Sequence, residues 1–166
     1  MRPLLRLMAV LVFVASSTLA VSPLAAHAAG QRAPFAGRWI DVDVSAHTAT
    51  AMEGDTPIYT APITAGRPAF PTSQGTFYIL RRVYSETMDS STIGIPNDAP
   101  GGYYLPHVMY TQYFTSDGEA LHGNYWQPDS VFGNVNTSHG CVGMRNGDAA
   151  FFWSFASIGT PVVVHG

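Results

Sequence analysis

Charged residues are scarce in this 166-residue sequence: they make up 11% of the chain, against about 25% in a typical soluble domain. That shortage argues against long, solvent-exposed helices. Lysine is absent altogether, the positive residues are all arginine, and the net charge is −3. Without a basic stripe to neutralise phosphates, the chain is not expected to bind nucleic acid. Its length fits a single domain.

Cysteine occurs once, at Cys141, so the chain cannot form an intramolecular disulfide. A membrane span needs about 20 consecutive apolar residues. No apolar run of that length follows the N-terminal stretch. No membrane span is therefore expected in the mature chain.

The N-terminus itself resembles a secretory signal peptide. Arg2 and Arg6 precede an uncharged apolar stretch (Leu7–Ala20), and Ala26-His27-Ala28 fits a small-x-small cleavage site. We expect residues 1–28 to be a signal peptide, 29–37 a short linker and 38–166 the functional domain. The alternative is an uncleaved membrane anchor. The predicted destination is outside the cytoplasm, in the cell wall or periplasm, where an unused thiol is a liability.

The remaining composition is that of a strand-and-turn protein, with 46% hydrophobic residues, 16 glycines and 12 prolines. We expect a mainly β domain, a sandwich or barrel with one short helix. The expected helix follows Cys141, with Asn146 or Asp148 as N-cap and Gly159 as its stop. The long segments 85–102 and 124–137 are expected to be loops, the first a lid. Strands are predicted at 38–44, 50–52, 58–64, 76–84, 103–114, 119–122 and 160–165.

Histidines accompany the single thiol. His139 lies two residues before Cys141, and His122 lies nineteen residues before it. An imidazole can take the proton of a thiol and so activate it as a nucleophile. His139 is too close in the chain for its side chain to converge easily on the thiol, which favours His122 as the base. Gly140 allows a tight turn that could aim backbone amides at an oxyanion.

Other interpretations of these residues stay open. Cys141 could be a buried core residue, although its Ser-His-Gly setting is polar. Cys141, His122 and His139 could bind zinc, although no Cys-x-x-Cys or His-x-x-x-His spacing supports a metal site. Outside this group, His107 is interpreted as structural, and Asp148 as a helix cap, with Arg145 as its partner.

The order of these residues resembles the signature of the L,D-transpeptidase catalytic domain family (YkuD-type). Fifteen residues separate His122 from the run Ser138-His139-Gly140-Cys141. The stretches 63–77 and 88–96 are similar to two further family segments, the second being the lid of mycobacterial-type members. The resemblance covers about 38–164 and implies an antiparallel β-sandwich, with no metal or cofactor.

The resemblance also implies a role for each residue. Cys141 is the nucleophile, His122 the proton donor and acceptor, and the Gly123 carbonyl orients the ring of His122. The substrate is a peptidoglycan tetrapeptide stem. The acceptor is a stem amine, which gives a 3→3 cross-link, and carbapenems are expected inhibitors. The oxyanion or substrate group comprises Ser138, His139, Gly140 and Tyr103, with Met88 and Arg145 as further candidate substrate contacts.

Gly143 departs from the family pattern, which commonly has Asn or Arg at that position. This departure affects the expected choice of substrate more than the chemistry. Two other functions remain: hydrolysis of the tetrapeptide as an L,D-carboxypeptidase, and a non-catalytic wall-binding module. We expect the protein to be a monomer.

Overall fold

The computed structural model describes residues 34–166, so the expected signal peptide and most of the linker lie outside the described residues. Within these residues there are one α-helix, one short 3-10 helix and nine strands. In chain order they are β1 (Arg38–Asp43), β2 (Thr48–Glu53), β3 (Thr56–Thr64), β4 (Gly75–Tyr78), β5 (Arg81–Asp89), η1 (Ser90–Ile93), β6 (Tyr104–Tyr113), β7 (Ala120–Gly123), β8 (Val142–Met144), α1 (Asn146–Phe155) and β9 (Pro161–His165).

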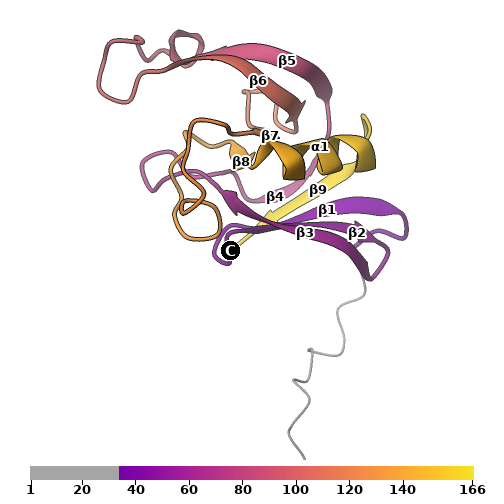
Figure 1. Ribbon diagram of the computed structural model, residues 1–166. Helices are drawn as coiled ribbons and strands as arrows, with labels where there is room; N and C mark the ends of the chain where they lie inside the picture. The colour runs from indigo at the N-terminus through magenta and orange to yellow at the C-terminus, as the bar shows by residue number, and fades with distance from the viewer. Residues whose placement is uncertain (1–33) are drawn as a thin grey trace, which may run out of the picture. The chain divides into compact units, whose positions relative to one another are not determined.

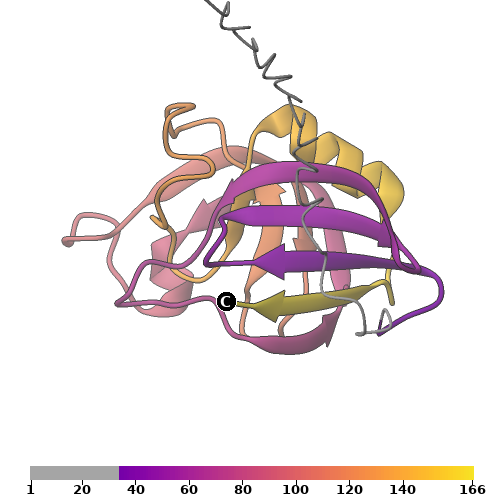
Figure 2. The same cartoon turned by 90° about the horizontal axis from the view of Figure 1, so that it is seen from below.

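The strands form one curled sheet in the order β4-β9-β1-β2-β3-β8-β7-β6-β5. Figure 1 shows β5 and β6 on one side of α1 and the group β1, β2, β3 and β9 on the other; Figure 2 shows this second group face-on. The prediction of a mainly β domain with one short helix is confirmed. The sheet is mixed, however, because β1 pairs with β9 and β7 with β8 in parallel.

The core lies inside the curl of the sheet and is closed by α1. Phe152 of the helix is fully buried with Ile40, Ile63, Phe114 and Leu121, which come from both halves of the sheet. Burying each such side chain contributes about 1.5–3 kcal/mol. The segment after Cys141 is therefore held in place by the core. In the described part of the chain, no helix is both long and apolar enough to cross a membrane.

The predicted strand 76–84 is divided in two. Its first part, β4, pairs with β9, and its second part, β5, pairs with β6. At the break, the Ile79 amide donates to Thr160 O and the next amide, of Leu80, donates to Tyr113 O. The chain thus crosses between the two ends of the sheet, which the unbroken apolar pattern did not indicate.

The helix begins and ends differently from the prediction. Its N-cap is Arg145, without a side-chain capping bond, and it ends at Phe155, before Gly159. The prediction that Asn146 or Asp148 caps the helix is wrong. Asp148 lies in the first turn, where its carboxylate accepts a hydrogen bond of 2.5 Å from the Tyr59 hydroxyl.

Two short parallel strands at the centre of the sheet position the candidate site. All residues of β7 and β8 are buried, and His122 of β7 pairs with Gly143 of β8. Cys141 directly precedes β8, so the register brings it beside the start of β7. The three-residue β8 was not predicted. Strand β5 also extends to Asp89, which shortens the expected lid to about 90–103.

Candidate active site

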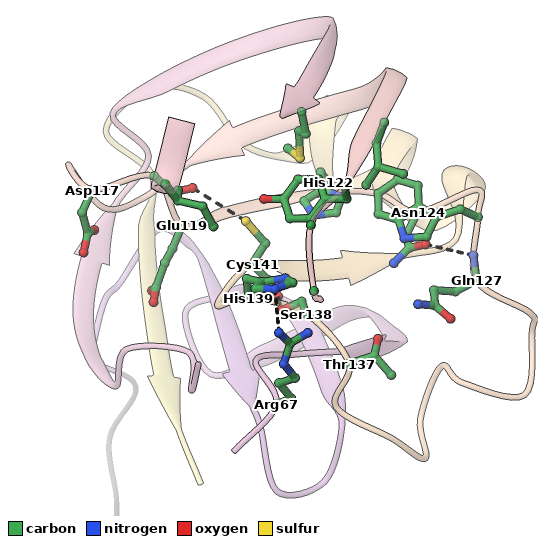
Figure 3. Close-up of a pocket in the computed structure, with 18 residues that line it drawn as sticks. Arg67, Asp117, Glu119, His122, Asn124, Gln127, Thr137, Ser138, His139 and Cys141 are labelled. Carbon is green, nitrogen blue, oxygen red and sulfur yellow. Dashed lines mark hydrogen bonds between the residues drawn. The ribbon is translucent and has the colours of Figure 1, made fainter. Parts of the chain in front are cut away.

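Cys141 and His122 line the same cavity, which has a volume of about 390 Å³. The lid contributes Ile93 and Tyr103, strand β5 contributes Met88, and Trp126 lies in the loop after β7. Figure 3 shows Cys141 at the centre of the labelled residues, with Asp117 and Glu119 on one side and Asn124 and Gln127 on the other. The two residues predicted to carry the chemistry are thus brought together by the fold.

The Cys141 thiol is half-buried and its Sγ donates to the Gly118 carbonyl oxygen at 3.7 Å (Figure 3). Burial raises the pKa of Cys141 to about 12, and the nearby carboxylates of Glu119 and Glu86 also raise it. The Ala120 backbone opposes this rise through a hydrogen bond. At neutral pH the resting residue is therefore a thiol, which needs a base at the moment of attack.

His122 is buried, and its Nδ1 lies 2.9 Å from the Gly123 carbonyl oxygen. Since a carbonyl only accepts, Nδ1 carries the proton and Nε2 keeps a free lone pair. The ring stacks on Trp126 at a centroid distance of 5.7 Å. Burial lowers the pKa of His122, partly offset by the Gly123 hydrogen bond. The imidazole is thus neutral and oriented, as a general base must be.

His139 lines the same cavity but its Nε2 is already occupied. Nη2 of Arg67 lies 2.6 Å from this nitrogen, and because arginine only donates, Nε2 must be the acceptor. The ring also packs against Phe70 and Tyr103, at centroid distances of 4.8 and 5.3 Å. This arrangement favours His122 over His139 as the base, in the same direction as the residue spacing.

The turn before Cys141 is held by its own hydrogen bonds. Ser138 Oγ donates to Cys141 O at 2.6 Å and accepts from the Gly140 amide at 3.1 Å, and Gly140 has a φ of +121°. The Gly140 amide is therefore not free to bind an oxyanion, contrary to the prediction. Within residues 34–166 the amides of His139 and Cys141 donate to no acceptor, so these two remain available.

The lid residues are placed by η1 and its flanks. The Tyr103 amide donates to Ser90 Oγ at 2.8 Å, and the Ser90 amide donates back to Tyr103 O at 3.0 Å. Burial raises the pKa of Tyr103, and negative charge on Cys141 or Asp89 raises it further. Tyr103 and Met88 both line the cavity, as predicted substrate contacts should.

Arg145 does not lie in this cavity. Its guanidinium bonds Asp129 at 2.9 Å and lies over the Phe132 ring, with Asp148 4.0 Å away. The prediction of Arg145 as a substrate contact is thus not supported by its position. His107 is exposed, with a φ of +57°, and also lies outside the cavity.

Several cavity residues were not singled out from the sequence: Arg67, Glu119, Asn124 and Trp126. Glu119 accepts from the Ser73 amide and hydroxyl at 3.1 Å, and so joins the loop after β3 to β7. The sequence offered one indication of these residues, their nearness to the recognised motifs. Asn124 and Trp126 closely follow His122, and Arg67 lies in a segment that resembles the family.

Asn124 explains the glycine at position 143. A Cβ on Gly143 would lie 2.8 Å from Asn124 Nδ2 and 3.2 Å from Thr64 Cγ2. Asn124 is buried against this position while lining the cavity, and its Oδ1 accepts from the Gln127 amide. The glycine therefore makes room for Asn124.

Cys141 also lines a second hollow, of about 530 Å³, which shares Met88, Tyr103 and Asp117 with the first and continues toward Glu86. The thiol is thus reachable from two sides. Among residues 34–166, no three His, Cys, Asp or Glu side chains are grouped so that they could hold a metal ion.

Comparison with known proteins agrees with this geometry. Residues 37–164 match the model of the YkuD family, described as the L,D-transpeptidase catalytic domain. Probable L,D-transpeptidase 3 of Mycobacterium tuberculosis is 40% identical over 103 residues, which are 62% of this chain and 37% of that protein. The chain thus spans little more than a third of this relative.

Solved structures with the same fold include two with bound β-lactams. L,D-transpeptidase 3 from Mycobacterium tuberculosis, in complex with a faropenem-derived adduct, has a TM-score of 0.70 and 33% identity, covering 78% of this chain and 60% of that one. L,D-transpeptidase LdtMt1, in complex with imipenem, has a TM-score of 0.74 and 31% identity, covering 78% and 59%. By the extent of the family match and the arrangement of its cavity, this chain belongs to the L,D-transpeptidase catalytic domain family.

Proposed function

We propose that the chain is a cysteine acyltransferase that cross-links peptidoglycan, an L,D-transpeptidase. The observation that carries the proposal is the orientation of His122: its Nδ1–H is held by the Gly123 carbonyl, and its Nε2 is free in the cavity that Cys141 lines. A neutral, buried imidazole beside a neutral thiol suits proton transfer during attack.

In the first half-reaction, Nε2 of His122 takes the thiol proton while Sγ of Cys141 attacks the carbonyl carbon of the third stem residue. The amides of His139 and Cys141 stabilise the oxyanion. When the intermediate collapses, the C–N bond to the terminal D-alanine breaks, and His122 returns the proton to the leaving amine. A thioester on Cys141 remains.

In the second half-reaction, the amine of a neighbouring stem attacks the thioester carbonyl. His122 takes the proton of the attacking amine, the C–S bond breaks, and the proton passes to the sulfur, which restores the thiol and leaves a 3→3 cross-link. The two hollows that share Cys141 support transfer, because donor and acceptor can approach from different sides.

Hydrolysis is the second candidate, since water could replace the acceptor amine at the exposed side of the thiol. The experiment that separates the two activities is muropeptide analysis after incubation of the purified protein with tetrapeptide-bearing muropeptides. Transfer predicts 3→3 dimers, which a Cys141→Ala variant does not form. Tripeptide monomers without dimers would establish hydrolysis instead. If the chain is a wall-binding module, it should bind the cell wall without converting the stem peptides, and Cys141→Ala should bind equally well.

Two further features belong to the same proposal. The site of action is outside the cytoplasm, in the cell wall or periplasm, which the signal-like N-terminal sequence supports. Carbapenems are expected to acylate Cys141, since the relative LdtMt1 was solved in complex with imipenem.

A further inference from the structure

Arg67 is a cation in the cavity without a carboxylate partner. In the described part of the chain its guanidinium makes one hydrogen bond, of 2.6 Å to His139, and lies 4.8 Å from the centroid of the Phe70 ring and beside Gly101. No carboxylate of residues 34–166 lies within 4.0 Å of it. Since a guanidinium has five N–H donors, most remain available to a ligand.

The backbone of Arg67 is fixed relative to the thiol. Its amide donates to Ser138 O at 3.0 Å, and its carbonyl accepts from the Phe70 amide at 2.8 Å. One residue earlier, the Gly66 amide donates to Thr72 Oγ1 at 2.8 Å, and this hydroxyl donates to Gly140 O at 2.7 Å. The loop that carries Arg67 is thus bonded directly to the turn that carries Cys141.

Charge in the cavity is arranged with opposite signs on different sides of Cys141. Figure 3 shows Arg67 on one side, with its guanidinium directed at His139, and Asp117 and Glu119 on another. A ligand carboxylate is repelled by the acidic side and attracted by Arg67. Guanidinium groups bind carboxylates through paired, charge-assisted hydrogen bonds.

We propose that Arg67 binds a carboxylate of the acyl donor peptide and so makes the chain selective for donors with that carboxylate free. The inference rests on the proposed function, whose donor is a tetrapeptide stem. Two carboxylates have the required chemistry: the C-terminal carboxylate of the leaving residue, and a side-chain carboxylate of the third residue. The first lies on the residue after the attacked carbonyl, and the second lies on the residue that carries this carbonyl.

The test measures kcat/KM for release of the terminal residue from three synthetic tetrapeptides: the free acid, its C-terminal amide and its side-chain amide. The wild-type chain should prefer the free acid over one of the amides by about tenfold or more. The amide that is disfavoured identifies the carboxylate that Arg67 binds.

Substitution then assigns this preference to the residue. Arg67→Gln should lower kcat/KM on the free acid by about ten- to a hundredfold and leave the disfavoured amide nearly unaffected. Arg67→Lys, which keeps the charge but not the forked geometry, should recover part of the loss. Arg38→Gln is the matched control: Arg38 lies on β1, contacts Phe155, and should change nothing.

Three results would overturn the inference. The wild-type chain could show no preference for the free acid, Arg67→Gln could lower kcat/KM by the same factor on all three peptides, or it could have no effect on any. An equal loss on all peptides would mean that Arg67 only positions His139. If the wild-type chain released no terminal residue from any peptide, the proposed function itself would fail, which is a distinct outcome.

Discussion

At the residue scale, the chemistry depends on two neutral groups. Burial raises the pKa of Cys141 to about 12 and lowers that of His122, so neither a thiolate nor an imidazolium is favoured at rest. The proton must then move as the sulfur attacks the substrate. A single orienting bond, from His122 Nδ1 to the Gly123 carbonyl, keeps the acceptor nitrogen free.

The depressed pKa of His122 predicts the acidic limb of the pH profile. The neutral base is the active form, and it is lost only as pH falls through the folded-state pKa, which lies below the ordinary value of 6.5. The second-order rate of acylation by imipenem should therefore fall on the acidic side with a midpoint below 6.5. A stopped-flow pH series measures this limb. A midpoint at or above 6.5 would contradict the burial argument.

Glu119 predicts the reactivity of the thiol. Its carboxylate helps to raise the pKa of Cys141, so Glu119→Gln should increase the thiolate fraction and the rate of alkylation by iodoacetamide at pH 8, by about three- to tenfold. Glutamine keeps an oxygen acceptor for Ser73, which limits structural change. Glu53→Gln, at the exposed end of β2, is the control. An unchanged or slower rate in Glu119→Gln would rule out this electrostatic effect.

At the scale of the elements, the pairing of β7 with β8 decides which side chains can occupy the site. Gly143 on β8 faces Asn124, which follows β7, and the two positions share one small volume. A side chain at position 143 therefore competes directly with Asn124. The family-typical asparagine cannot be restored at this position without a second change.

Gly143→Asn should lower the free energy of unfolding by about 1–3 kcal/mol, because its Cβ would lie 2.8 Å from Asn124 Nδ2. Chemical denaturation measures the loss. Gly147→Asn is a matched control, since a Cβ there meets no atom within 4 Å. In the double variant Gly143→Asn/Asn124→Ala part of the stability should return. Additive losses in the double variant would show that the two positions do not compete.

Sequence patterns predicted those elements whose signal is local. The hairpin of β2 and β3, the strand β9 and the helix after Cys141 follow from alternation, turn residues and apolar spacing. The three-residue β8 has no pattern of its own, and the break at Ile79 depends on pairing with distant strands. The prediction of Asp148 as the helix cap was wrong because its carboxylate bonds Tyr59, a residue 89 positions away.

The same division holds for the site. Cys141, His122 and Gly123 were identified from a motif with fixed spacing. The structure brings Cys141 and His122 to one cavity and places the Gly123 carbonyl oxygen 2.9 Å from His122 Nδ1. Arg67 comes from the loop after β3, and its amide is joined to the motif by a hydrogen bond to Ser138 O. Glu119 directly precedes β7 and accepts a hydrogen bond from the distant Ser73. Arg145 was suggested by the resemblance to the family, yet it bonds Asp129 instead.

At the scale of the whole molecule, residues 34–166 contain all the groups that the proposed chemistry needs, and the N-terminal sequence is predicted to be a cleaved signal peptide. The exported protein should begin at Ala29, after cleavage behind Ala28. The intact mass of protein recovered outside the cytoplasm tests this directly. A mass that retains residues 1–28 would indicate a membrane anchor in place of a cleaved signal peptide.

The central claim is that Cys141 is an acyl-accepting nucleophile activated by His122. The most direct measurement is the intact mass of the native protein after incubation with imipenem, beside Cys141→Ala treated identically. We expect the wild-type mass to rise by one covalently bound carbapenem and the Cys141→Ala mass to stay unchanged. No adduct on the native protein, or an undiminished adduct on Cys141→Ala, would contradict the account.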